Sequence, residues 1–362
     1  MIYLDYNATT PLDPRVLEAM RPYFGEKFGN ASSRPHKFGS EARDAVETAR
    51  AEAAALIGAD PEEILWTSGA TESDNLALKG VTAEGRDQIV TVATEHRAVL
   101  DPVERLGNVT VLGVRRDGSL DLDRLAKAIT DKTLLVSVMH ANNETGLLHP
   151  IADIGKLCRA KGAYFHTDAT QSYGKEPIDV NRDSIDLLSA SAHKFCGPKG
   201  IGLLYVRKRG PRVRCNAILH GGGQEKGLRP GTLNVPGIVG FGAAAEICRR
   251  ERDAEQPRIR ALRDRLESGL KGAVNGDPSK RLANTTNIGF DGVDADALMK
   301  KLPDLAMSTS AACTSARMQP SYVLGAMGCD ETRIKGSLRL SIGRFTTEAE
   351  IDEAVRAISA AR

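Results

Sequence analysis

The chain contains 362 residues, more than a single hydrophobic core usually organises, so two domains are expected. Hydrophobic residues make up 41% and charged residues 27%, as in an ordinary soluble globular protein, and the net charge of +2 gives no reason to expect nucleic acid or a membrane as an electrostatic partner. The six cysteines are widely spaced and include no Cys-x-x-Cys pair, which argues against a zinc site or a secreted disulfide framework and fits a reducing cytoplasm.

Helical patterns appear at three places along the chain. Residues 1–6, which precede them, have neither a basic segment nor an apolar core, so no signal peptide is expected, and no apolar stretch is long enough to cross a bilayer. Residues 41–58 place alanines and aliphatic side chains on one stripe that closes at a glycine, which predicts a helix. A second helix is predicted over 150–162, which begins with proline and ends with glycine, and the longest pattern spans 235–274.

Short apolar runs alternate with helical patterns over most of the first half of the chain. Near-continuous apolar strands separated by helices are typical of a largely parallel sheet covered on both faces, so the predicted fold class is α/β. The long helical pattern becomes highly charged after Cys248, where we expect a domain transition, and residues 281–362 resemble a smaller α+β domain. The strand candidates are 63–67, 88–92, 133–139, 163–166, 186–189 and 201–206.

Four polar segments follow strand candidates, and ligands of an open α/β sheet bind at the carboxyl ends of its strands. In the first segment, 67–72, Gly69 would let the backbone approach a ligand and the following helix start would favour an anion. An ordinary helix N-cap is the alternative. Neither a Walker loop nor a Gly-x-Gly-x-x-Gly fingerprint is present here.

The second and third segments add an imidazole and an acid. His96, in 94–96, could cover an aromatic ring or simply be a hydrogen-bonded loop histidine. Asp168, in 166–171, stands at the mouth of a buried strand, where a carboxylate needs a positive partner. A protonated pyridine nitrogen, a magnesium ion or a helix N-terminus would serve.

The fourth segment, 189–194, places Lys194 just past another apolar strand. A lysine at a desolvated strand end can have a depressed pKa and form a Schiff base, although a single such lysine is more often a surface residue. Taken together, the segments supply an imine-forming lysine, an acid for a ring nitrogen, a ring-covering group and a phosphate cradle. These are the needs of pyridoxal 5′-phosphate (PLP), and no metal or nucleotide site needs all four.

In these residues and their order, the chain resembles the cysteine desulfurases of the NifS/IscS type, within the fold-type I, class V aminotransferase group of PLP enzymes. The resemblance runs essentially end to end and implies a large PLP-binding domain (13–252) with a mostly parallel, seven-stranded-type sheet. It also implies a smaller α+β domain, made of 1–12 and 253–362, that carries the catalytic cysteine loop. The matching segments are 3–11, 28–30, 67–75, 142–146, 166–171, 193–200, 220–225, 229–232 and 337–341.

The resemblance also implies roles for individual residues. Lys194 would hold PLP covalently and act as the base, Asp168 would pair with the pyridinium nitrogen, and His96 would stack on the ring and relay protons. Asn143 and Arg339 would grip the substrate carboxylate, for which an arginine fork is geometrically suited. The ring hydroxyl would be bound by Gln171, and the phosphate by Ala70, Thr71, Ser191 and His193, with Thr232 reaching it from the partner subunit of a homodimer.

The sulfur acceptor implied by the resemblance is Cys313, which would attack the substrate sulfur and become a persulfide. It stands within 308–316, nine small residues without a large apolar anchor, for which a mobile loop is the expected structure. Family members often read Ser-Ser-Gly-Ser-Ala-Cys up to the nucleophile, whereas Ser310 stands here in place of the glycine, which predicts lower loop flexibility. The sequence also ends at Arg362, where longer relatives continue into a tail that helps to dock the iron–sulfur scaffold.

The expected function is therefore conversion of L-cysteine to L-alanine by a cytoplasmic transferase. Its sulfur would go to an acceptor protein, either an iron–sulfur cluster assembly scaffold or an enzyme of tRNA thiolation, without direct contact to nucleic acid or membrane and without a metal. A selenocysteine lyase or an aminotransferase on the same fold is an alternative. Two silent alternatives are a PLP-binding adaptor and a nucleotide-binding α/β domain without PLP.

Overall fold

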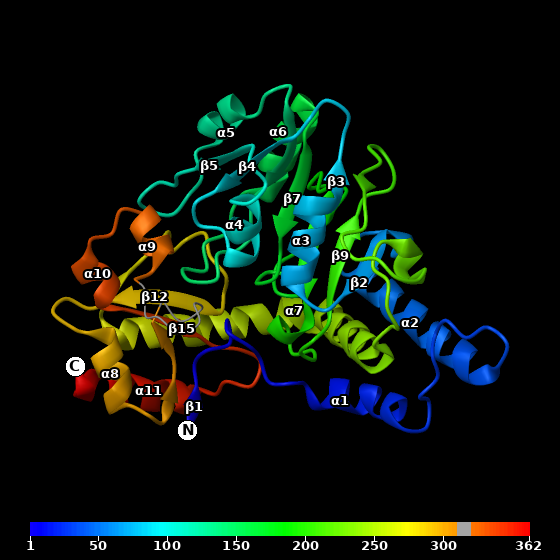
Figure 1. The fold of residues 1–362 in the computed structure, drawn as a ribbon. Helices are drawn as coiled ribbons and strands as arrows, with labels where there is room; N and C mark the ends of the chain where they lie inside the picture. The colour runs from blue at the N-terminus through cyan, green and yellow to red at the C-terminus, as the bar shows by residue number, and fades with distance from the viewer. Residues whose placement is uncertain (310–319) are drawn as a thin grey trace.

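The computed structural model describes residues 1–309 and 320–362. Within them the chain builds a seven-stranded and a four-stranded sheet, each packed on a hydrophobic core, and two short two-stranded pairs (Figure 1). The large sheet has seven strands in these residues, in the order β2-β9-β8-β7-β6-β4-β5. Its strands are β2 (Ile64–Thr67), β4 (Gln88–Val92), β5 (Val109–Leu112), β6 (Thr133–Ser137), β7 (Tyr164–Asp168), β8 (Leu187–Ser191) and β9 (Gly202–Val206).

The α/β fold class and the mostly parallel sheet are confirmed. The strands from β8 to β5 pair in parallel, with Val136 opposite Phe165 between β6 and β7, while β9 is antiparallel to both of its neighbours. All six strand candidates form strands, with bounds that differ from the prediction by at most two residues. Strand β5 was not predicted, because it lies at the sheet edge and its side chains are only partly buried.

Helices cover both faces of the large sheet, as Figure 1 shows. One face packs against α2 (Lys37–Ala55), α6 (Ile151–Lys161) and the first half of α7 (Val235–Leu270). The other face packs against α3 (Ala70–Gly80) and α4 (Arg97–Val103). The three predicted helices are therefore present, and α2 begins four residues earlier than expected because His36 caps it through its Nδ1.

The small sheet lies beside the second half of α7 and has the order β11-β12-β15-β14, all antiparallel. Its core is completed by α8, α11 and Leu4 from the N-terminal segment. Helix α7 thus contributes to both cores without interruption. The elements are β11 (Ala273–Val274), β12 (Thr285–Gly289), β14 (Ser308–Thr309), β15 (Ser337–Ser341), α8 (Ala295–Lys301) and α11 (Glu348–Ala361).

Short elements complete the described chain. Strand β1 pairs in parallel with β13, which brings the N-terminus against the small domain's strands, and β3 pairs with β10. Among the helices described, none is long and apolar enough to span a membrane. The remaining elements are β1 (Ile2–Tyr3), β3 (Val81–Thr82), β10 (Arg214–Cys215), β13 (Leu305–Ala306), α1 (Pro14–Met20), α5 (Leu122–Ala128), α9 (Tyr322–Ala326), α10 (Glu331–Lys335), and the 3₁₀ turns Arg21–Phe24, Pro61–Glu63, Ala192–Lys194 and Gln224–Gly227.

Candidate functional site

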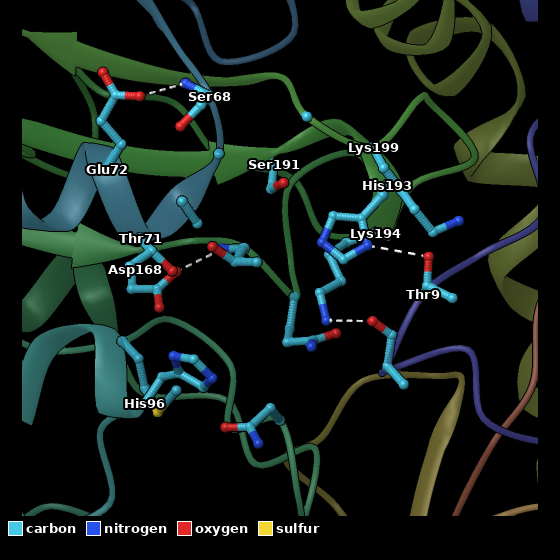
Figure 2. A pocket seen from close by; sticks show the side chains of 18 of the residues that line it. Thr9, Ser68, Thr71, Glu72, His96, Asp168, Ser191, His193, Lys194 and Lys199 are labelled. Carbon is cyan, nitrogen blue, oxygen red and sulfur yellow. Dashed lines mark hydrogen bonds between the residues drawn. The ribbon is translucent and has the colours of Figure 1, made fainter. Parts of the chain in front are cut away.

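A cavity of about 500 Å³ opens at the carboxyl ends of β2, β7 and β8 (Figure 2). Its position agrees with the rule for ligand sites of open α/β sheets, and its volume suits a small cofactor. Most of the predicted site residues meet here. The cavity is lined by the predicted residues Ala70, Thr71, His96, Asn143, Asp168, Gln171, Ser191, His193 and Lys194.

Two of the predicted site residues that the structure describes, Thr232 and Arg339, are not in this lining. Thr232 is exposed and lies outside the cavity. Arg339 is buried behind it, at 2% exposure, and donates from Nη1 to the backbone oxygen of Asn143 at 3.1 Å. Cys313 lies outside the described residues, so its prediction is not tested by the structure.

One wall of the cavity is the start of α3, where backbone N–H groups are available to an anion. The Glu72 carboxylate accepts the Ser68 backbone N–H at 2.7 Å and binds Arg229 at 2.8 Å. Burial opposes ionisation of Glu72, but Arg229 and Ser68 outweigh it and lower its pKa. Gly202 on β9 must be glycine, because a Cβ there would lie 2.6 Å from the Cα of Gly69.

Lys194 lies in the 3₁₀ turn after β8 and points toward the N-terminal segment. Its Nζ donates to the backbone oxygens of Asn7 at 2.5 Å and Ala8 at 2.9 Å. The turn is anchored by the next residue, Phe195, whose ring contacts Phe241 of α7 at a centroid distance of 5.1 Å. Packing therefore fixes the lysine at the cavity wall while its amine stays inside a polar environment.

His193 stands beside the lysine and is uncharged near neutral pH. Its Nδ1 is 3.1 Å from the Thr9 hydroxyl. Burial, followed by the nearby charges of Lys194, Lys199 and Lys175, lowers the pKa of His193 to about 4. The neutral ring can therefore donate its one N–H to an anion such as a phosphate.

Asp168 ends β7 at the floor of the cavity. Its Oδ1 accepts the Thr170 backbone N–H at 2.9 Å. Two more carboxyl groups, Asp74 and Glu95, are fully buried nearby, and burial together with the charge of Asp168 raises the pKa of both. The rise in the pKa of Glu95 is opposed only by the hydrogen bond from the Met139 backbone N–H, which the Glu95 Oε1 accepts at 2.6 Å.

The histidine beside these acids supplies no positive charge. His166 has its Nδ1 at 2.8 Å from Ser137 Oγ and its Nε2 at 3.0 Å from Ser189 Oγ, and burial lowers its pKa to about 4. It therefore stays neutral although its Nε2 is 3.5 Å from the Asp74 carboxylate. A cationic ligand atom at Asp168 would balance the acid cluster, and a protonated pyridine nitrogen is such an atom.

His96 borders the cavity from the start of α4. Its Nδ1 accepts the Ala98 backbone N–H at 3.1 Å, which fixes the ring and leaves the proton of the neutral imidazole on Nε2. The preceding segment is held by the hydroxyl of Tyr322, which donates to the Glu95 backbone oxygen at 2.7 Å. The ring is thus oriented before any ligand arrives.

Several lining residues have polar atoms without a hydrogen-bond partner in the described part of the chain. They include the side-chain oxygens of Asn143, Gln171 and Thr170. Buried polar atoms are normally satisfied, so these three are available to a polar ligand. Together with the Asp168 carboxylate, the Lys194 amine and the helix start, they fit the ring, aldehyde and phosphate of PLP.

The segment Asn7–Thr9 is the part of the site that residue-by-residue reasoning missed. Ala8 and Thr9 line the cavity, and Asn7 O accepts both Lys194 and the Gln171 Nε2 at 2.9 Å. The only signal in the sequence is the polar run within 3–11, to which the resemblance to the family assigns no role. No cluster of three metal-ligating side chains occurs among the residues that the structure describes.

Comparisons with known proteins agree with this geometry. The family model of the class V aminotransferases matches residues 2–354. "Cysteine desulfurase IscS" of Anaeromyxobacter sp. (strain Fw109-5) is 55% identical over 370 residues, which cover 99% of this chain and 91% of that protein. A solved "NifS-like protein" superposes with a TM-score of 0.92 at 38% identity, covering 99% and 98% of the two chains. The structure "SspA in complex with cysteine" superposes with a TM-score of 0.83 at 35% identity, covering 96% and 100%.

Proposed function

From the premise that this chain belongs to the class V aminotransferase family, as a PLP-dependent cysteine desulfurase of the NifS/IscS type, we propose how its residues divide the work. The observation that carries the proposal is the meeting of Lys194, Asp168 and the α3 start around one cavity. When bound there, PLP supplies an electron-withdrawing ring that makes the α-proton of a bound amino acid acidic.

Lys194 would hold the cofactor covalently and would take the α-proton of the substrate. Asp168 would hold the proton of the pyridine nitrogen, and Gln171 would bind the ring hydroxyl. His96 would cover the ring and move protons through Nε2. The phosphate would be bound by Ala70, Thr71, Ser191 and His193, which is supported by their position around the cavity and by the N–H groups at the start of α3.

Asn143 and Arg339 bind the substrate carboxylate. The support is that the Arg339 Nε is a buried donor without a partner in the described residues, and that Arg339 Nη1 donates to the Asn143 backbone oxygen, which places the two residues side by side.

Cys313 accepts the sulfur. Its thiolate attacks the substrate Sγ, so a sulfur–sulfur bond forms as the Cβ–Sγ bond breaks. The electron pair of the broken bond stays with the substrate, which takes up protons and leaves as L-alanine, and the enzyme keeps a persulfide. The sulfur then passes to an acceptor, either an iron–sulfur cluster scaffold or a tRNA-thiolating enzyme.

We propose that the working unit is a homodimer in the cytoplasm, with Thr232 reaching the phosphate of the partner subunit. The chain is anchored at Glu225, which precedes Thr232 in the same loop. Glu225 binds the Arg50 guanidinium through both oxygens, each at 2.8 Å, and also accepts the Trp66 backbone N–H at 2.9 Å. The division into 13–252 and 1–12 with 253–362 is supported by the two separate hydrophobic cores.

Borohydride reduction of the PLP-loaded protein, followed by peptide mapping, tests this assignment. We expect the pyridoxyl adduct on Lys194, and an adduct on another lysine would refute it. Alanine release from cysteine separates the active enzyme from a silent PLP-binding adaptor. Release of a 2-oxo acid would indicate an aminotransferase, and a preference for selenocysteine over cysteine would indicate a lyase.

A further inference from the structure

A second cavity, of about 30 Å³, shares Lys194 with the large one. Its other walls include the segment after β7, the segment after β8, α7 and the segment after β15. They include Lys175, Gln256 and the thiols of Cys196 and Cys248. The cavity is too small for a substrate but has room for a water molecule.

Lys175 separates this cavity from solvent. With Gln256 it also lines an open surface groove of about 510 Å³. The Lys175 Nζ and the Gln256 Oε1 are both buried, and neither has a hydrogen-bond partner in the described residues. A buried ammonium needs acceptors, and water in the small cavity would supply one to Lys175 and a donor to Gln256.

We propose that Lys175 is a positioning residue whose ammonium, facing Lys194 across the small cavity, opposes protonation of the Lys194 amine. This inference rests on the proposed role of Lys194. The uncharged amine is the form that attacks an aldehyde and accepts a proton. Lys175 would thus act on the reaction without touching cofactor or substrate.

The electrostatics agree with this geometry. Burial, followed by the charge of Lys194, lowers the pKa of Lys175 to about 8. The repulsion is mutual, so a charged Lys175 opposes protonation of Lys194. Below about pH 8 Lys175 keeps most of its charge, which covers the neutral range. The groups facing Lys175 are Glu176, Lys194, Cys196, Cys248, Glu255 and Arg344.

The remaining titratable groups around Lys175 and Lys194 also contribute to the electrostatic potential at the two amines. Tyr6 lines the small cavity, and Glu72, His96, Asp168, His193 and Lys199 line the large one with Lys194. Glu255 contacts Arg344 at 2.8 Å. The charges of Glu255 and Arg344 therefore offset each other. Lys175 is then a cation on the small-cavity side without an ion-pair partner among the described residues.

The test uses cofactor-free protein, so that it does not depend on turnover. The rate at which acetic anhydride labels Lys194 is followed against pH by mass spectrometry of the peptide. We expect K175M and K175Q to raise the midpoint equally, by on the order of one pH unit, because both remove the charge and differ in polarity. K175R should keep the wild-type midpoint. K156M, which removes an exposed lysine of α6 that lines none of these cavities, is the control and should also keep it.

An unchanged midpoint in folded K175M and K175Q would overturn the proposal, and thermal unfolding verifies that the variants are folded. A second readout is the pH-dependent absorbance of the bound cofactor, whose midpoint should rise in the same two variants. Borohydride mapping of the wild-type protein distinguishes failure of the proposed function from failure of the Lys175 proposal. An adduct away from Lys194 refutes the proposed function, whereas an adduct on Lys194 with unchanged midpoints refutes only the role of Lys175.

Discussion

Asp5 accepts a hydrogen bond from Nη2 of Arg339 at 2.7 Å, so the guanidinium proposed for the substrate is already paired with a carboxylate of the same chain. Asp5 precedes the cavity-lining segment and Arg339 lies on β15, so the contact joins the N-terminus to the small sheet. Asp5 therefore already uses one of the guanidinium donors that would bind the substrate carboxylate.

Asp5→Asn should lower the KM for cysteine roughly fivefold, which corresponds to about 1 kcal/mol, because the guanidinium no longer shares its donors with a second anion. The same change should lower the free energy of unfolding by about 3 kcal/mol, since a buried charge loses its partner. Steady-state kinetics and denaturant unfolding measure the two effects. A raised KM would mean instead that Asp5 orients Arg339 for the substrate.

Asp168→Asn should reduce kcat/KM for alanine formation on the order of 100-fold, because the pyridine nitrogen loses the charge that keeps it protonated. Asp74→Asn is the matched control. Burial raises the pKa of Asp74 and so favours its neutral form, and an amide of the same shape should therefore change the rate little. If the two variants lost activity equally, the distinction between the acids would be wrong.

Cys313→Ser should abolish sulfide release from cysteine while leaving the borohydride adduct on Lys194 intact. The hydroxyl is a far weaker nucleophile toward sulfur than a thiolate. Cys158→Ser is a suitable comparison, since burial raises the pKa of that thiol beyond the useful range and it should carry no sulfur. Persulfide mapping after reaction with cysteine should label wild type and Cys158→Ser at position 313. Label elsewhere would contradict the assignment.

His149→Phe should make stability less sensitive to acid. Burial lowers the pKa of His149 to about 4, below its unfolded value, so the unfolded chain binds an extra proton between about pH 6.5 and 4. Stability from the neutral ring is therefore full above pH 6.5 and is lost as pH falls, by up to about 3 kcal/mol at pH 4. Neither ring nitrogen has a partner in the described residues, so phenylalanine removes no hydrogen bond there. Urea unfolding at pH 7.5 and 4.5 gives the difference, and an unchanged difference in the variant would exclude this role.

Lys194, Asp168 and the start of α3 could be predicted from the sequence because each follows a buried strand, and parallel strands bring their carboxyl ends together. The partners that come from far along the chain could not. The contacts of Asn7 with Lys194 and of Asp5 with Arg339 join residues 187 and 334 positions apart, and no local pattern encodes them. The antiparallel direction of β9 was also hidden, since a fully buried strand has the same apolar pattern in either direction.

Helix α7 packs Phe241 into one core and Leu266 into the other within 36 continuous residues. Melting either core would strip the apolar cover from half of this helix and weaken the other half. Both cores should consequently unfold in one cooperative thermal transition, and calorimetry of the cofactor-free protein should record a single endotherm instead of two.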